Sequence, residues 1–543
     1  MDMDKAAAGT SVTGERVSRT RRRASWPLIA AVTAVMAALF IPLTRPASAA
    51  AGGGQREGLV CAGGSTADFF NPPKAPIPQH PSFVLTAQDG YITTPDGNSV
   101  YMWGYASGTA GYQDPGPVLC VNEGDAVTIT LRNTLPVPTS IQFPGLTDVL
   151  ANNAPSQLQP ATRSLATAAA ADTGSRPNYV DPGHVTSVTY SFVVDHPGTF
   201  VYESGTDPEL QVQMGLVGAI IVRPRVGNPC FTGTPAVGTV CTPSNHVYDD
   251  AGATPAMATD PVSCAKPAGG LACFSTFGPK KEYLHLLSEI DPMLHEAIEA
   301  TTAATTDPYG YDMTTYRARY FFINGRSFPD TVSPNFAAHL PSQPYGSLVH
   351  IQPRNTEQYL ANSTTVNLDY NPDPALVRYI NAGPVDYPFH PHSNNERQVG
   401  FDAHPLLNTT NAANPTDASV DRFSVVVPPG ATLETEFAWV DQANWDPVKH
   451  SISSGGADNV VVPDQQARTE GQFWSGTPYL GSHADLSTGV TQFNECGEMY
   501  QVAHSHALFQ ATTYGASMGG MLTMIRIDPP NSFAGHADCT TGN

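Results

Sequence analysis

Residues 118–131 read VLCVNEGDAVTITL. Apolar and β-branched residues on both sides of the turn Glu123-Gly124-Asp125 alternate as they do in a pair of β-strands. Strand-like runs follow at 190–194, 200–202 and 219–222, and an earlier run begins near 83–85. Because turn residues such as Pro197-Gly198 separate these runs, the pattern predicts an antiparallel β-sandwich or barrel.

The second half of the chain repeats this pattern. Strand signals return at 282–287, 320–323, 375–380, 423–427 and 521–525, and residues 292–300 predict one short helix. A Pro-Gly pair precedes a Thr-rich strand at Pro182-Gly183 and again at Pro429-Gly430. A similar order of strands and turns in both halves indicates that one β-domain has been duplicated. We therefore expect an all-β chain with domains at 77–225 and 281–530.

The segments outside these domains have the composition of linkers and tails. Residues 50–76 are rich in small residues and predict a flexible arm, and residues 151–180 predict a long surface loop. Residues 226–280 are rich in Pro, Gly and Thr and contain four cysteines, which indicates a linker or excursion between the domains. Residues 531–543 form a C-terminal tail.

Composition excludes several classes of protein. The chain has 543 residues, of which 41% are hydrophobic and 14% charged, with Gly 47 and Pro 49. This mixture disfavours coiled coils and helical bundles. Lys+Arg 27 against Asp+Glu 48 gives a net charge of −21, which would repel a phosphate backbone. We expect no nucleic-acid partner and regard cations as better partners.

The first 49 residues predict an export signal peptide. A basic stretch that includes Arg21-Arg22-Arg23 precedes an apolar run at 28–43, and Ala47-Ser48-Ala49 supplies small residues for cleavage. The arginine pair is also found in twin-arginine signals. An uncleaved N-terminal anchor is the alternative, but the run is short and Pro42 interrupts it. We expect a secreted or extracytoplasmic protein without an integral membrane domain after cleavage.

The cysteines predict disulfide bonds, because exported proteins oxidise their thiols. Short spacings suggest two local loops, Cys230/Cys241 and Cys264/Cys273, although the sequence does not settle the connectivity. No Cys-x-x-Cys pair is present, which disfavours zinc–thiolate and dithiol redox chemistry. The eight cysteines are Cys61, Cys120, Cys230, Cys241, Cys264, Cys273, Cys496 and Cys539.

Two of the chain's histidine groups have the spacing His-x-His: His390-Pro391-His392 and His504-Ser505-His506. Side chains two residues apart on a strand share one face, so each pair can direct two imidazoles to a common point. Two such strands side by side would offer four nitrogen ligands, which suit copper(II) or zinc. The alternative is that these histidines bind no metal and form hydrogen bonds at the interface between two domains.

These motifs and their surroundings resemble the multicopper oxidase family, over most of residues 80–530. The resemblance implies two cupredoxin-like Greek-key β-sandwich or barrel domains with long loops. Four stretches carry it: an opening strand, the close of the first domain, the family's His-Pro-Phe-His-x-His, and its His-Cys-His with the following Gly-Met. In this chain they are residues 121–127, residues 197–202 with 215–222, Tyr387-Pro388-Phe389-His390-Pro391-His392, and His504-Ser505-His506 with Gly519-Gly520-Met521.

The chain departs from the family at half of the histidines that hold its three-copper cluster. The first motif corresponds to Gln142-Phe143-Pro144-Gly145, and the second to Tyr202-Glu203-Ser204-Gly205, so Glu203 is the one donor left there. In the third and fourth motifs the chain keeps His390, His392, His504 and His506, and the resemblance implies that these four are metal ligands. If the family superposition holds, Tyr202, Glu203 and Tyr387 would line the site.

The family's blue copper site is also altered. Its thiolate and imidazole positions are Ser505 and Tyr387 here, and a serine hydroxyl does not replace a soft, ionised sulfur. Without the thiolate, Met518 and Met521 are expected to be packed core residues. We therefore expect no blue copper.

The resemblance implies an exported copper-dependent oxidoreductase with a reduced copper site and an unknown number of ions. Its substrate would be a small molecule or dioxygen. Related two-domain oxidases form their cluster between subunits, usually in a trimer, whereas the retained histidines all belong to one domain, so an oligomer is not required here. The alternative is a non-catalytic cupredoxin scaffold that binds or buffers copper or binds a protein partner. Motifs of hydrolases and nucleotide-dependent enzymes are not evident.

Overall fold

The computed structural model describes residues 58–66, 79–155, 161, 186–223, 282–301, 311–351, 375–392, 395–408, 416–437 and 499–527. The predicted signal peptide, most of the 50–76 arm and the 151–180 loop, the 226–280 linker, the C-terminal tail and six of the eight cysteines lie outside these ranges. Cys61 and Cys120 are described, and they form a disulfide. No helix in the described part is long and apolar enough to cross a bilayer.

Strands are the main secondary structure of the described chain and its helices are few and short, which confirms the all-β prediction. The helix predicted at 292–300 is α5 (Pro292–Glu299). It begins here because Asp291 caps the Met293 amide and Pro292 occupies the first turn, where no backbone donor is needed. The other short elements are α3 (Pro208–Gln211), η2 (Met313–Thr315), η3 (Asp330–Val332) and η5 (Leu508–Ala511).

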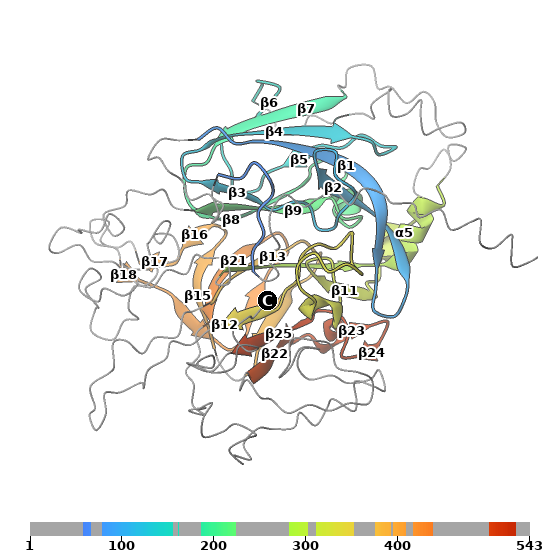
Figure 1. Ribbon diagram of the computed structural model, residues 1–543, viewed down its shortest axis with the longest axis vertical. Coiled ribbons are helices and arrows are strands. Elements are labelled where there is room, and N and C mark those ends of the chain that lie inside the picture. Colours follow the sequence, from blue (N-terminus) through green and yellow to red (C-terminus); the bar gives the residue numbers. More distant parts are fainter. Residues whose placement is uncertain are drawn as a thin grey trace, which may run out of the picture. The chain divides into compact units, whose positions relative to one another are not determined.

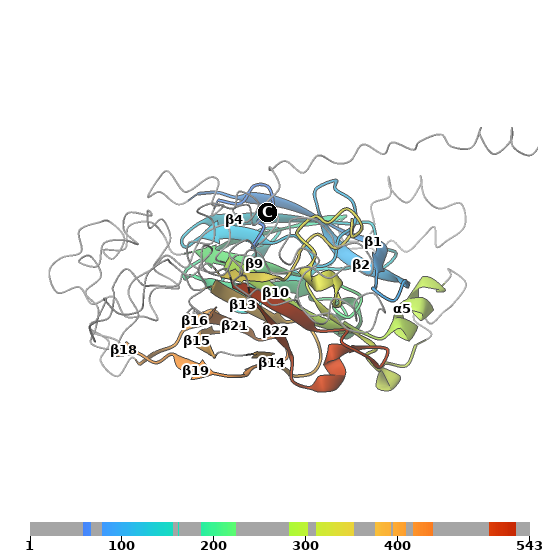
Figure 2. The ribbon, with the colours of Figure 1, turned by 60° about the horizontal axis from the view of Figure 1, so that its bottom comes forward.

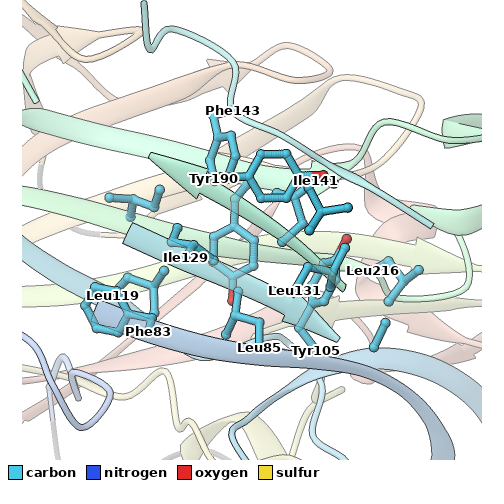
Figure 3. Packing of buried hydrophobic residues seen from close by; sticks show 14 of the residues in the cluster. Phe83, Leu85, Tyr105, Leu119, Ile129, Leu131, Ile141, Phe143, Tyr190 and Leu216 are labelled. Carbon is cyan, nitrogen blue, oxygen red and sulfur yellow. Dashed lines mark hydrogen bonds between the residues drawn. The ribbon is translucent and has the colours of Figure 1, made fainter. Parts of the chain in front are cut away.

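The first half folds into two sheets (Figure 1). One sheet has the order β2-β1-β4-β7-β6, and the other has the order β3-β9-β8-β5. Apolar side chains fill the space between the sheets, where Phe143 and Tyr190 meet edge to face with ring centroids 5.3 Å apart (Figure 3). The strands are β1 (Ser82–Thr93), β2 (Ser99–Ser107), β3 (Leu119–Asn122), β4 (Ala126–Asn133), β5 (Ile141–Gln142), β6 (Leu150–Ala151), β7 (Ser187–Val193), β8 (Gly198–Ser204) and β9 (Val217–Arg223).

The two strands expected around Glu123-Gly124-Asp125 are present as β3 and β4, but they are not paired with each other. Strand β3 pairs with β9 and strand β4 pairs with β1, both in parallel, so the purely antiparallel prediction is also wrong. Gly124 has a φ of 81°, and the Asp125 carboxylate accepts a hydrogen bond from the Asn122 amide at 2.9 Å. This turn carries the chain from one sheet to the facing sheet instead of closing a hairpin.

The second half contains a second pair of sheets. Their orders are β11-β10-β13-β21-β15-β16, with β19 on β15, and β12-β25-β22-β14-β20. The small pairs β17–β18 and β23–β24 complete it. The strands are β10 (Glu282–Ile290), β11 (Tyr320–Ile323), β12 (Val349–Ile351), β13 (Ala375–Asn381), β14 (Tyr387–Pro391), β15 (Glu396–Phe401), β16 (His404–Pro405), β17 (Leu407–Asn408), β18 (Thr416–Asp417), β19 (Val420–Arg422), β20 (Val425–Val427), β21 (Thr432–Phe437), β22 (Met499–Ser505), β23 (Thr512–Thr513), β24 (Ala516–Ser517) and β25 (Leu522–Ile527).

The pairing of strands repeats between the halves, as expected of a duplication. The path β2-β1-β4-β7 corresponds to β11-β10-β13-β21, and β3-β9-β8-β5 corresponds to β12-β25-β22-β14, with the same parallel and antiparallel directions. The β5–β8 pair is therefore the structural counterpart of the β14–β22 pair. Residues at matching positions of these pairs can be compared directly.

A buried ionic network joins the two sandwiches. Glu282 on β10 accepts hydrogen bonds from Arg223 Nη2 at 2.6 Å and from Arg378 Nε at 2.8 Å. Arg378 also donates to the Thr199 hydroxyl on β8, and the Thr199 amide donates to Glu434. Because these groups are withdrawn from water, their mutual pairing is what makes their burial tolerable.

Candidate metal centre

The two His-x-His motifs lie at the ends of neighbouring antiparallel strands, β14 and β22, which Figure 2 shows side by side. His390 and His504 are within the strands, and His392 and His506 follow directly after them. His390 is directly opposite His504 in the pairing. Phe389 of β14 is buried in the core of the second sandwich, and its partner Ser505 is also buried. Because alternate side chains of a strand face opposite sides, the imidazoles lie together on the other face of this sheet.

The structure brings all four predicted ligands close to one another. The ring centroid of His390 lies 5.1 Å from that of His392, 5.8 Å from that of His504 and 4.9 Å from that of His506. The centroid of His504 lies 5.0 Å from that of His392 and 5.9 Å from that of His506. The closest approach joins His392 Nε2 and His504 Nε2, which are 3.0 Å apart.

Backbone carbonyls set the tautomers of two of these rings. His504 Nδ1 is 2.8 Å from the Ser505 carbonyl oxygen, and His390 Nδ1 contacts the Phe423 carbonyl oxygen. A carbonyl oxygen accepts hydrogen bonds, so each Nδ1 carries the proton and each neutral ring keeps its lone pair on Nε2. His392 Nε2 must then donate to His504 Nε2. A metal-binding histidine usually donates a hydrogen bond from the ring nitrogen that does not bind the metal, and these two carbonyl contacts are of that kind.

Burial differs across the group and favours neutral rings. His504 is buried and His390 is half-buried, whereas His392 and His506 are exposed. Burial lowers the pKa of His504, and the partial loss of water around the His392 ring lowers the pKa of His392; the neighbouring imidazoles lower both pKa values further. Metals bind the neutral ring, so this environment reduces the competition from protons.

Imidazole nitrogens suit a transition metal, and two of them are spaced as two ligands of one ion would be. The proton that His392 Nε2 donates to His504 Nε2 has to leave before one ion binds both nitrogens. Metal–imidazole bonds of about 2.0–2.1 Å leave two ligand nitrogens of one ion about 3 Å apart, as His392 and His504 are. As the side chains stand, no group of three or more His, Cys, Asp or Glu side chains in the described ranges surrounds a single point. A third ligand therefore requires rotation of His390 or His506, and the exposed His506 ring has room to turn.

The matching position in the first sandwich offers no imidazole. Gln142 is opposite Glu203 on the β5–β8 pair, in the place of His390 and His504, and its amide donates to Glu203 Oε1 at 2.8 Å. Burial raises the pKa of Glu203, which weakens it as a ligand because metals bind the ionised carboxylate. The Gln142 and Glu203 side chains satisfy each other.

Two tyrosines expected to line the site face elsewhere. Tyr387 is buried in the second core and its hydroxyl lies 3.2 Å from Glu289 Oε2, whereas Tyr202 is buried in the first core and donates to the Pro117 carbonyl. Both lie on the inner faces of their strands, so this expectation is wrong for both. Ser505 is buried and donates to the Gln510 side chain, and Met521 is packed in the core.

Sequence reasoning missed the contribution of Phe423. Its carbonyl orients His390, and its ring lies 6.2 Å from the His390 ring although the Phe423 side chain is 71% exposed. Little in the sequence indicates the contact between Phe423 and His390, because an aromatic residue just before β20 is typical of the start of a strand.

Comparison with known proteins found no matching family model and no matching curated protein. Among solved structures, the chain is similar to the "Multicopper Oxidase mgLAC", with 17% identity over 83% of this chain and 86% of that chain and a TM-score of 0.42. It is similar to the blue copper oxidase from Nitrosomonas europaea, with 16% identity, 83% and 86% coverage and a TM-score of 0.41. Copper nitrite reductase from the same organism gives 15% identity, 85% and 99% coverage and a TM-score of 0.38. These similarities concern the fold.

Proposed function

We propose that this chain is an exported copper-dependent oxidoreductase of the multicopper oxidase type with a reduced copper site. His390, His392, His504 and His506 hold the copper. The observation that carries the proposal is the gathering of four imidazoles on one face of β14 and β22, with His392 Nε2 and His504 Nε2 3.0 Å apart. The motif resemblance around these residues supports copper as the metal.

The chain's own groups prepare this site. The Ser505 and Phe423 carbonyls hold the rings of His504 and His390 with Nε2 unprotonated, and burial keeps His504 neutral. His392 and His506 are exposed, so a small molecule can reach the site from solvent. Bound there, copper would supply one-electron redox chemistry toward a small reducing substrate or dioxygen.

The test is metal analysis of protein purified from its own host, together with a double variant. We expect about one copper per chain and oxygen consumption with reducing substrates. Replacing His392 and His506 together by Ala should abolish copper binding while circular dichroism stays unchanged. His339→Ala is the matched control, because His339 is an exposed histidine paired with Asp330 at 3.8 Å. Stoichiometric copper in the double variant would contradict the assignment.

A non-catalytic copper-binding scaffold is the second candidate. The observation that favours it is the pairing of Gln142 with Glu203 at the positions that match His390 and His504. Copper bound without oxygen consumption would favour a copper-binding or buffering scaffold, and a negligible metal content would favour a scaffold for a protein partner. Both candidates predict no blue absorption band, because Ser505 replaces the thiolate.

Export is part of the proposal and rests on the N-terminal sequence. N-terminal sequencing of protein recovered outside the cytoplasm should begin near Ala50, after Ala47-Ser48-Ala49. A mature chain that retains the arginine stretch would contradict it.

A further inference from the structure

Two further histidines, one from each half of the chain, meet where the two sandwiches touch. His196 lies in the turn between β7 and β8, and His404 begins β16. Their ring centroids are 4.8 Å apart, and the planes of the rings are at 89° to each other. The pair is separate from the His-x-His motifs and is used by none of the chemistry proposed above.

The backbone holds these two histidines together. A Cβ added at Gly198 would lie 2.5 Å from the Ala403 Cβ, so a glycine is needed for the turn before His404 to come this close to the start of β8. Ala403 is 1% exposed and packs in the core of the first sandwich. Its φ of 60° is a left-handed conformation that alanine rarely adopts. The contact of Ala403 with Gly198 therefore stabilises a strained turn that places His404 beside His196.

The His196 ring has a defined orientation. Its Nδ1 lies 3.2 Å from the Pro197 carbonyl oxygen, which accepts the hydrogen bond, so the neutral ring keeps its lone pair on Nε2. The buried Phe200 ring packs against it at 5.3 Å. His196 Nε2 lies 3.7 Å from Asp195 Oδ1, so a nitrogen lone pair and a carboxylate oxygen lie close together. Either a second proton on the ring or a metal ion would satisfy both atoms.

The spacing and the donors suit a metal ion. When two imidazoles bind one ion at about 2.0–2.1 Å, their ring centroids lie roughly 5 Å apart, as those of His196 and His404 do. Two imidazoles and a carboxylate are a donor set that holds zinc and leaves a further position to water. The Asp195 side chain is 61% exposed and His404 is exposed, so both can turn toward a common point. An ion can also enter directly from solvent.

We propose that His196, His404 and Asp195 form a second metal site, which takes a divalent transition-metal ion such as zinc and links the two sandwiches. An ion bound there connects the turn between β7 and β8 in the first half to the turn between β15 and β16 in the second half. It therefore stabilises the contact between the halves. The site is independent of the four-histidine site and of the proposed function.

The experiment titrates Zn²⁺ into the full, metal-free chain that carries His392→Ala and His506→Ala, which weakens competition from the four-histidine site. Isothermal titration calorimetry should find about one ion per chain, and the melting temperature should rise with Zn²⁺ concentration because the ion binds the folded chain. Adding His404→Ala or His196→Gln should weaken the binding by more than about tenfold, since even the loss of an outer contact of a metal ligand costs about 10–100-fold. Each of these variants should also remove the rise in melting temperature.

His339→Ala, added to the same background, is the matched control and should leave the binding unchanged, because His339 is an exposed histidine paired with Asp330. Circular dichroism before zinc is added checks that every variant is folded. Zinc binding that is unchanged in His404→Ala or in His196→Gln would overturn the inference. If the chain takes up no zinc, His196 and Asp195 form an ion pair only, and the inference is overturned as well.

Discussion

Glu282→Gln should destabilise the fold strongly, because Glu282 neutralises two buried guanidinium groups. Its Oε2 accepts from Arg223 Nη2 at 2.6 Å and from Arg223 Nε at 3.2 Å, and its Oε1 accepts from Arg378 Nε at 2.8 Å. The Glu282 side chain is 0% exposed, and those of Arg223 and Arg378 are 4% and 1% exposed. The substitution removes the charge and turns an acceptor into an NH2 donor that faces one of the arginines.

Removing one partner of a buried ion pair costs about 3–5 kcal/mol, because the remaining charge stays out of water. Glu434 lies 3.7 Å from Arg378 Nη1 and can compensate part of that charge. We therefore expect a loss of about 3 kcal/mol in the free energy of unfolding, toward the lower end of that range.

Urea denaturation followed by circular dichroism measures this loss, as a lower midpoint at an unchanged slope. Glu209→Gln is the matched control, since Glu209 is exposed in the first turn of α3 and should change stability by less than about 0.5 kcal/mol. A loss below about 1 kcal/mol for Glu282→Gln would refute the view that this network depends on full charge pairing.

Two further predictions concern pH and the blue copper position. Burial raises the pKa of Asp114 from 3.8 to about 7, so the folded chain binds this proton more tightly than the unfolded chain, and stability is lost as pH rises through that window. Asp114→Asn should flatten the dependence of melting temperature on pH, whereas the exposed Asp148→Asn should not; equal profiles would contradict the buried carboxyl. Ser505→Cys should yield copper-loaded protein without a blue band, because Tyr387 supplies no imidazole and points into the core. Intense blue absorption in that variant would show that another residue completes the site.

The sequence was sufficient to predict the face on which each histidine pair lies, because side-chain direction on a strand depends on local periodicity alone. It could not show that His392 and His504 would touch, since they are 112 residues apart and their contact depends on the pairing of β14 with β22. The turn at Gly124 illustrates the same limit. Its Asp and Gly suit a hairpin and a crossover between sheets equally well.

The burial of Glu396, whose carboxylate accepts a hydrogen bond from the Tyr379 hydroxyl at 2.6 Å, was also beyond reach from sequence. Glu396 begins a strand with polar and apolar neighbours, and a glutamate in such a position is ordinarily expected at the surface. Its burial follows from the packing of β15 beside β21, and that arrangement exists only in the folded sheet. The inward direction of Tyr387, by contrast, could have been read from its odd spacing to His390.

The repeated strand pairing gives this chain an internal reference. Strands β5 and β8 reproduce the backbone of β14 and β22, but they present an amide and a carboxyl where the second half presents imidazoles. Any difference in metal uptake between the two places therefore reports on side chains and not on scaffold. Replacing Gln142 and Glu203 by histidine would test whether the first half can take up a metal when it carries the side chains of the second half. The unaltered second half is the control within the same molecule.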